Sequence, residues 1–291
     1  MTVRIATRAS AQAVKQSEVV ATALRACGAD VQLVMVNTLG DRTQRTNTPL
    51  HAIGGQGVFV KEVQQAVLDG QAELAVHSAK DLPSTQADGL TIGAFMRRRS
   101  AADALVGRRL DELASGATVA TGSVRRRAQL RRARPDLEFA ELRGNIHTRL
   151  QKIPEGGSIV MAVAALEVLE LTHLVAERLD PSVFVPAVGQ GCVAVECAAR
   201  DRRSFELLSQ IDDLATRRSV TIERAYLAEL GSGCTLPVGA YVDDHGTLHT
   251  FLAGEAGQQA VSEALPLTGD VEAGIAVARQ AARRANAAVS R

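Results

Sequence analysis

The sequence is poor in aromatic residues and has no excess of charge of either sign. It has no tryptophan, two tyrosines and six phenylalanines, and 33 Lys and Arg against 32 Asp and Glu give a formal net charge of +1. Nucleic-acid binding through the segment RRRAQLRRARP, residues 125–135, would need stacking aromatics or a basic surface overall. We therefore expect no nucleic-acid partner, and any affinity for anions must come from the local arrangement of cations.

Long apolar runs and closely spaced cysteines are also missing. No stretch approaches the roughly 18 uninterrupted apolar residues of a membrane helix, and the N-terminal MTVRIATRAS is not a basic leader followed by an apolar core. Four cysteines, none of them spaced as CxxC, do not make a disulfide framework in a chain of 291 residues. We expect a cytoplasmic protein with reduced thiols and no membrane contact.

Nucleotide-binding motifs are absent as well. The glycine loop GGQGVFVKE, residues 54–62, runs into a predicted helix and could cradle a phosphate or hinge a mobile flap. It lacks the GKS or GKT ending of a P-loop, and GxGxxG occurs nowhere in the chain. Nucleotide binding is therefore not expected.

What the chain does contain is an alternation of strand and helix patterns. VRIAT at 3–7 is typical of a strand, Ser10 would cap the helix after it, and VQLVMV at 31–36 is typical of a second strand. The alternation continues with a helix at 59–70 and strands at 73–78 and 90–95, and, past a polar segment, with strands at 117–121 and 137–142, helices at 123–133 and 146–150, and an apolar segment at 158–166. This pattern predicts two α/β domains.

The C-terminal part has a different pattern. A helix at 220–231 is followed by a glycine-rich loop, two strands at 239–244 and 247–254, and a last helix. That helix has an apolar stripe of Val271, Ile275, Ala278, Ala282, Ala285 and Val289. We expect a small α+β third domain, which suits a length beyond what one core usually organises.

Positive side chains follow several predicted strands, at the places where open α/β sheets bind ligands. Arg125 and Arg126 would fall in the first turn of their helix, where the helix dipole disfavours cations and an anion would relieve them. A solvated, arginine-rich helix face is the alternative for that segment. The residues predicted to share an anion-binding cleft are Arg8, Ser10, Lys80, Asp81, Ser123, Arg125, Arg126, Arg143 and Arg149.

Two of the chain's reactive side chains stand out. Asp81, directly after Lys80 in HSAKD, would stay ionised beside cations and could bond a substrate ammonium or pyrrole N–H; a helix or turn cap is the alternative. Cys234, within GSGCTLPVG, is expected to be exposed and hence reactive, with a packed residue in a turn as the alternative.

Other cysteines and histidines give weaker signals. His245 and His249 lie in a predicted hairpin, so we expect no metal site there. Cys192 and Cys197 lie on a predicted strand, and we expect both in the core.

Seven segments in a fixed order connect these residues to a known family. RIATRAS, GGQGVFVKE, LAVHSAKDLP, SVRR, LRGNIHTRL, PAVGQG and GC-x-x-P-V-G resemble the porphobilinogen deaminases, also called hydroxymethylbilane synthases, over residues 4–239. The resemblance implies two α/β domains like periplasmic binding proteins, with the active site between them, and a small α+β C-terminal domain. The implied boundaries are 1–97 with 190–211, 98–189, and 212–291. CVAVEC, after PAVGQG, should then return as a strand to the first sheet.

The resemblance also implies a cofactor and a reaction. The family's cofactor is a dipyrromethane held by a thioether to a loop cysteine, which Cys234 matches. The implied reaction condenses four porphobilinogens head to tail with loss of ammonia at each step, until hydrolysis frees linear hydroxymethylbilane. Asp81 matches the catalytic aspartate. The matching cofactor-binding residues are Lys80, Ser123, Arg125 and Arg126, and the matching substrate-binding residues are Arg8, Ser10, Arg143 and Arg149.

The chain departs from the family pattern at the glycine loop. Gln56 and Ala52 stand where the family usually has lysines, so two cationic contacts are missing. By resemblance we expect a monomer that needs no metal. The main rival is a non-catalytic small-anion-binding protein with the same cleft, which would carry no covalent cofactor and normally an export signal.

Overall fold

The computed structural model describes residues 2–37, 60–231, 236–254 and 259–290. The contacts within the chain divide it into two units, residues 1–99 with 192–218 and residues 100–191 with 219–291. The first unit contains one sheet, and the described part of the second contains two. The predicted two α/β regions and α+β C-terminal region are confirmed at this level.

The first unit is built on a five-stranded sheet in the order β2-β1-β3-β10-β4. β1 pairs in parallel with β2 and β3, whereas β10 is antiparallel to β3 and β4. β10 covers most of CVAVEC, so the expected return of that segment to the first sheet is confirmed. The strands are β1 (Thr2–Arg8), β2 (Asp30–Val36), β3 (Leu74–Ser78), β4 (Leu90–Phe95) and β10 (Val193–Ala198).

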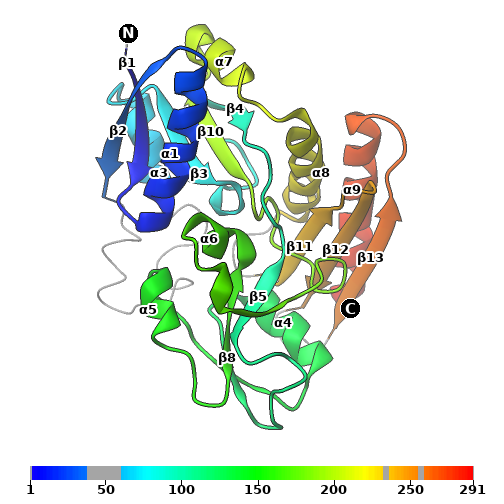
Figure 1. The fold of residues 1–291 in the computed structure, drawn as a ribbon. Coiled ribbons are helices and arrows are strands. Elements are labelled where there is room, and N and C mark those ends of the chain that lie inside the picture. Colours follow the sequence, from blue (N-terminus) through cyan, green and yellow to red (C-terminus); the bar gives the residue numbers. More distant parts are fainter. Residues whose placement is uncertain (1, 38–59, 232–235, 255–258, 291) are drawn as a thin grey trace. The chain divides into compact units, whose positions relative to one another are not determined.

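Helices cover both faces of this sheet (Figure 1). α1 (Ala11–Ala26) and α7 (Arg202–Ser209) pack with Ile5 on one face, and α3 (Lys61–Leu68) packs with Ala6 on the other. Neighbouring residues of β1 face opposite helices because side chains alternate along a strand. Polar groups can therefore reach solvent mainly at the strand ends.

The first helix begins where the sequence predicts. The hydroxyl of Ser10 accepts a hydrogen bond from the backbone N–H of Ala13 at 3.3 Å, which caps α1. Val20 and Leu24, one helical turn apart, are fully buried. Gly28 follows the helix with a φ of 83°, a left-handed conformation that disfavours other residues. This start places α1 directly after the end of β1.

The second unit contains a five-stranded sheet in the order β7-β6-β8-β5-β9. β6 is parallel to β7 and β8, and β5 is antiparallel to β8 and β9. The apolar segment 158–166 forms a strand followed by a helix. The elements are β5 (Asp103–Gly107), β6 (Thr118–Ala120), α4 (Val124–Ala133), β7 (Glu138–Ala140), α5 (Ile146–Leu150), β8 (Ser158–Ala162), α6 (Val163–Val168), η4 (Thr172–Leu174) and β9 (Val175–Arg178).

The C-terminal part of the second unit has an antiparallel sheet, with two helices packed against one of its faces (Figure 1). The sheet has a strand that the sequence analysis missed, β13, whose residues are exposed or half-buried, so its apolar signal is weak. The predicted stripe of the last helix is buried at Ala278, Ala282 and Ala285. The elements are α8 (Leu214–Leu230), β11 (Val238–Val242), β12 (Thr247–Ala253), β13 (Ala260–Pro266) and α9 (Val271–Val289).

Candidate active site

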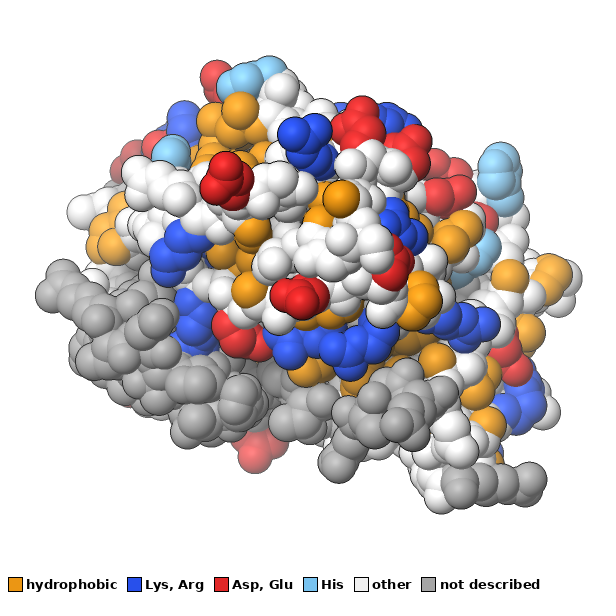
Figure 2. Space-filling model, turned by 90° about the horizontal axis from the view of Figure 1, so that it is seen from below, with side chains coloured by type: hydrophobic (Ala, Val, Ile, Leu, Met, Phe, Trp, Pro, Cys, Tyr) orange, Lys and Arg blue, Asp and Glu red, His pale blue; other side chains and the backbone are white. Residues whose placement is uncertain are grey.

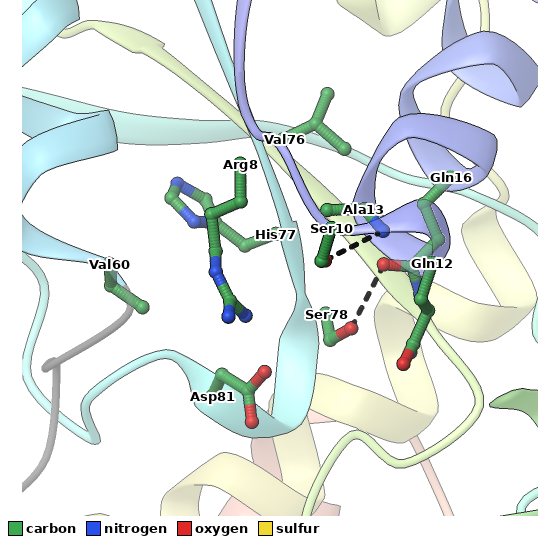
Figure 3. A pocket seen from close by; sticks show the side chains of 10 residues that line it. All are labelled: Arg8, Ser10, Gln12, Ala13, Gln16, Val60, Val76, His77, Ser78 and Asp81. Carbon is green, nitrogen blue, oxygen red and sulfur yellow. Dashed lines mark hydrogen bonds between the residues drawn. The ribbon is translucent and has the colours of Figure 1, made fainter. Parts of the chain in front are cut away.

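A pocket lies at the carboxyl ends of β1 and β3 in the first unit (Figure 3). Parallel strands end at the same edge of a sheet, so Arg8, the last residue of β1, and Ser78, the last of β3, come together there. Ser10, at the start of α1, also lines the pocket, as does Asp81 beyond β3. Its volume of about 50 Å³ is enough for water or a small ionised group. The structure thus brings Arg8, Ser10 and Asp81 together.

Asp81 belongs to a single turn, η3 (Ala79–Asp81), directly after β3. Figure 3 shows its carboxylate on the side of the pocket toward which the Arg8 guanidinium points. The carboxylate makes no hydrogen bond to any residue in the described ranges, so it does not cap a helix or turn there. Lys80, in the same turn, is half-buried. Asp81 is therefore an acid held in a pocket beside a cation, with its oxygens available.

Gln16 is a pocket residue that the sequence analysis missed. The hydroxyl of Ser78 donates a hydrogen bond to its Oε1 at 3.0 Å, which orients the amide (Figure 3). Gln12, one turn earlier on α1, also lines the pocket. Helical spacing could have indicated both glutamines, because residues four apart on a helix capped by Ser10 share the face that lines the pocket.

In the second unit the paired arginines at the start of α4 surround Asp103, the first residue of β5. Arg125 Nη2 donates to Asp103 Oδ2 at 2.8 Å, and Arg126 Nη2 donates to Oδ1 at 2.6 Å. The three side chains are 5%, 10% and 1% exposed, in the order Arg125, Arg126, Asp103. Burial alone would raise the pKa of Asp103, but the two guanidinium charges outweigh it and hold that pKa well below its usual range.

The sequence predicted an anion near the paired arginines at the start of α4, and the chain itself supplies one, the carboxylate of Asp103. A solvated helix face, the alternative interpretation, is wrong for Arg125 and Arg126, although Arg131 and Arg132 further along α4 are exposed. Two cations still share one carboxylate, and the buried Nε of Arg126 has no hydrogen-bond partner among the described residues. One more negative group would compensate this cluster.

Ser123 and Arg125 serve the local structure of this cluster. The Ser123 hydroxyl accepts a hydrogen bond from the backbone N–H of Arg126 at 3.4 Å and caps α4. Arg125 Nη1 donates to the Val185 carbonyl at 2.6 Å. Burial lowers the pKa of Arg125, against the opposing effect of Asp103. Arg126 makes a similar contact, since its Nη1 donates to the Val160 carbonyl at 3.1 Å, but its buried Nε has no partner among the described residues.

Gln190, from the PAVGQG segment, completes the cluster. Its Nε2 donates to Asp103 Oδ1 at 2.8 Å and to the Ala101 carbonyl at 2.7 Å. The sequence analysis used PAVGQG as a motif and assigned no contact to Gln190 or Asp103. The two residues lie far apart in the chain, so only the folded structure reveals the contact.

Arg143 and Arg149 lie around the short helix α5. Arg149 Nε donates to the Gly144 carbonyl at 2.8 Å, and the φ of Gly144 is 116°, which favours glycine. Asn145 caps the helix through the backbone N–H of Thr148 at 2.9 Å. Arg143 is half-buried, and burial lowers its pKa against the opposing effect of Glu141. Both arginines therefore lie on a segment with a defined backbone.

The predicted residues fall into separate groups, each described within its own unit. Arg8, Ser10, Lys80 and Asp81 belong to the first unit, and Ser123 and the other four predicted arginines belong to the second. Cys234, Gln56 and Ala52 lie outside the described residues.

The hairpin histidine His249 contacts a carboxylate, and the two cysteines of the predicted strand are buried. His249 Nε2 lies 2.9 Å from Asp243 Oδ2, and the described residues contain no group of three or more His, Cys, Asp or Glu that could hold a metal. Cys192 and Cys197 are buried, as expected for core residues, and burial raises the pKa of Cys197 to about 11.

The surface of the protein carries charges of both signs (Figure 2). Figure 2 shows one face on which Lys and Arg side chains gather in a band among acidic and apolar ones. Within the part of the chain that the structure describes, no helix combines the length and the apolar character needed to cross a membrane.

Comparison with known proteins gives a consistent result. Residues 3–206 match the family described as porphobilinogen deaminase, dipyromethane cofactor binding domain. Proteins named porphobilinogen deaminase from Acidothermus cellulolyticus and Brevibacillus brevis are 48% and 42% identical, covering 81% and 82% of this chain and 74% and 79% of their own. The protein of that name from Streptococcus sanguinis is 39% identical and covers 88% of both chains.

Among solved structures the similarity is more distant. The BvgS VFT2 domain of Bordetella pertussis is 16% identical with a TM-score of 0.45, over 72% of this chain and 86% of that one. A periplasmic substrate-binding protein of an ABC transporter from Coxiella burnetii is also 16% identical, with a TM-score of 0.43 over 74% and 94%.

Proposed function

This chain belongs to the porphobilinogen deaminase family, and we propose how its own residues carry out the family's reaction, with Asp81 as the catalytic carboxylate. It is a hydroxymethylbilane synthase, a transferase that joins four porphobilinogens head to tail, releases ammonia at each addition and yields linear hydroxymethylbilane. The family match does not favour a non-catalytic anion-binding protein of the same architecture.

The observation that carries the role of Asp81 is its free carboxylate in the pocket beside Arg8. A carboxylate in this position can accept a hydrogen bond from the substrate's ammonium or pyrrole N–H. As the C–N bond breaks and ammonia leaves, positive charge develops on the pyrrole, and a fixed negative charge stabilises it.

The chain carries a dipyrromethane cofactor, and the Asp103 cluster fits such a group. The cofactor supplies the pyrrole terminus to which new rings are joined, and it bears several carboxylates. Arg126, with its buried unpartnered Nε and the excess of positive charge around it, is suited to bind one of them. In our proposal Arg125 and Ser123 support that contact, Lys80 is a further cofactor-binding residue, and Cys234 supplies the sulfur of the thioether.

The substrate's acetate and propionate groups require further cations. We assign them to Arg8 with Ser10 at the first unit's pocket, and to Arg143 and Arg149 around α5 in the second unit. Arginine suits this role because its planar fork of donors matches a carboxylate in two parallel hydrogen bonds.

The wider properties of the protein belong to the same proposal. We propose three domains, residues 1–97 with 190–211, residues 98–189 and residues 212–291, on the basis of three separate sheets. We further propose that the protein acts in the cytoplasm as a monomer that needs no metal.

The test of the covalent cofactor is the intact mass of the denatured protein after expression in cells that make porphobilinogen. We expect the mass of the chain plus two pyrrole units in the wild type, and the bare chain in Cys234→Ser. Cys192→Ser is the matched control, because that thiol is buried in the core, and it should retain the added mass. An unchanged added mass in Cys234→Ser would contradict the attachment site.

A further inference from the structure

A buried imidazole at the pocket of Arg8 and Asp81 has no part in the roles proposed so far. His77, on β3, lines that pocket, and its side chain is only 3% exposed. β1 and β3 run in parallel with Ala6 beside Ala75, and Arg8 and His77, each two residues further along its strand, both line the pocket. Figure 3 shows the imidazole ring next to the stem of Arg8. His77 therefore belongs to the wall that a bound substrate meets.

Glu196 holds this ring from the next strand. Its Oε2 lies 3.1 Å from His77 Nε2, and its side chain is 2% exposed. In the antiparallel register Glu196 lies opposite Ala75, two residues before His77, so the two side chains are diagonal neighbours on one face of the sheet. Gln64, on α3, donates to the same Oε2 at 2.8 Å. The carboxylate is thus fixed by a second element, and it fixes the ring in turn.

This arrangement assigns different tasks to the two ring nitrogens. A carboxylate can only accept hydrogen bonds, so a proton on Nε2 suits the contact with Glu196, although the contact is not a hydrogen bond in this structure. Nδ1 has no hydrogen-bond partner in the described part of the chain. Charged groups reach the ring's surroundings from three elements, Arg8 from β1, Asp81 from η3 and Glu196 from β10, while α3 contributes the neutral Gln64.

We propose that His77 is a further substrate-binding residue, which accepts a hydrogen bond at Nδ1 from the aminomethyl nitrogen of bound porphobilinogen. Glu196 is its positioning residue, since it orients the ring without touching the substrate. A carboxylate behind an imidazole fixes the tautomer and the orientation of the ring, so that the other ring nitrogen can accept a hydrogen bond. The inference rests on the proposed function, because it takes porphobilinogen as the ligand of this pocket.

Two substitutions separate the tasks of the ring. In His77→Gln the side-chain amide extends to the place of Nε2 and can still contact Glu196, but nothing occupies the place of Nδ1. In His77→Asn the shorter amide reaches the place of Nδ1 and loses Glu196. We expect His77→Gln to fold like the wild type, carry the full cofactor mass and lose about tenfold in kcat/KM, as for one lost hydrogen bond. His77→Asn should be less stable but recover part of kcat/KM.

The measurements are steady-state kinetics, intact mass after mixing with limiting porphobilinogen to time the first ring addition, and urea unfolding. Gln65→Leu, on the same helix, is the matched control, because its amide donates to Asp69 at the surface and not to Glu196, and it should leave kcat/KM unchanged. Wild-type kcat/KM and ring addition in His77→Gln would overturn the proposal, as would an Asn variant no better than the Gln variant.

A replacement variant and the activity of the wild type complete the test. If neither His77 variant folds, Glu196→Gln replaces them, and unchanged kcat/KM in that variant overturns the proposal. A wild-type protein that consumes no porphobilinogen would contradict the proposed function itself, whereas an active wild type with fully active His77 variants would contradict this inference alone.

Discussion

The pocket of the first unit and the Asp103 cluster of the second use the same residue types in opposite ways. Both place arginine and aspartate after or at the ends of strands. In the pocket the Asp81 carboxylate keeps its oxygens available, whereas Asp103 is enclosed by Arg125, Arg126 and Gln190. This difference agrees with the catalytic task proposed for Asp81 and with a structural task for Asp103, although both lie near arginines.

The largest expected effect comes from the free acid. Asp81→Asn should lower kcat by about 10²- to 10⁴-fold, because the amide cannot stabilise developing positive charge. Stability should stay within about 0.5 kcal/mol, since the carboxylate makes no hydrogen bond to another described residue. Kinetics, urea unfolding and intact mass check this, and the cofactor mass should be retained. Near-normal turnover would break the comparison, since the open acid would then have no chemical task.

For the enclosed acid, Asp103, we expect the main effect of substitution on stability, where Asp81→Asn has little. Asp103→Asn leaves two buried guanidinium groups without their carboxylate, and we expect a loss of about 3–5 kcal/mol in the free energy of unfolding. Urea unfolding at matched cofactor occupancy measures it, with Asp81→Asn as the control. A stability equal to that of the wild type would show that the cluster is not the structural element its burial indicates.

The stability lost in Asp103→Asn should depend on pH. The pKa of Asp103 is lowered in the folded protein relative to its usual value of 3.8, so the charged carboxylate stabilises the fold above about pH 4. That stabilisation is lost as the pH falls further, toward the folded pKa. The difference in stability between wild type and Asp103→Asn should therefore be full at pH 7 and shrink below pH 4.

The smallest effect is expected at the next arginine of α4. Arg127 pairs with Glu141 at the surface, where the two side chains are 30% and 64% exposed, so Arg127→Ala should cost less than about 1 kcal/mol and leave kcat/KM unchanged. Thermal or urea unfolding and steady-state kinetics measure this. A large kinetic effect would mean that the cluster of functional cations extends beyond Arg126.

Much of the secondary structure could be predicted from the sequence, because caps and strand patterns depend on residues that are close together in the chain. The cap at Ser10 and the return of CVAVEC to the first sheet are both confirmed. β13 was missed because its residues are at most half-buried, which leaves little apolar periodicity to detect.

Partners that are distant in the sequence could not be predicted in this way. The resemblance pointed to Arg125 and Arg126, but nothing local shows that Asp103 and Gln190 meet them, since packing of separate strands and loops creates that contact. For the same reason the sequence singled out Asp81 but not His77, whose partner Glu196 lies on a strand contributed by a remote segment.

The place of β10 has a consequence for the order in which the protein folds. This strand lies between β3 and β4, yet the whole β5–β9 sheet separates it from them in the sequence. During synthesis, the sheet that carries Asp81 cannot close until residue 198 has been made, and until then β3 and β4 each have an unpaired edge. The β5–β9 sheet is complete by Arg178, so we expect it to form first and the sheet edge next to Asp81 to be assembled late.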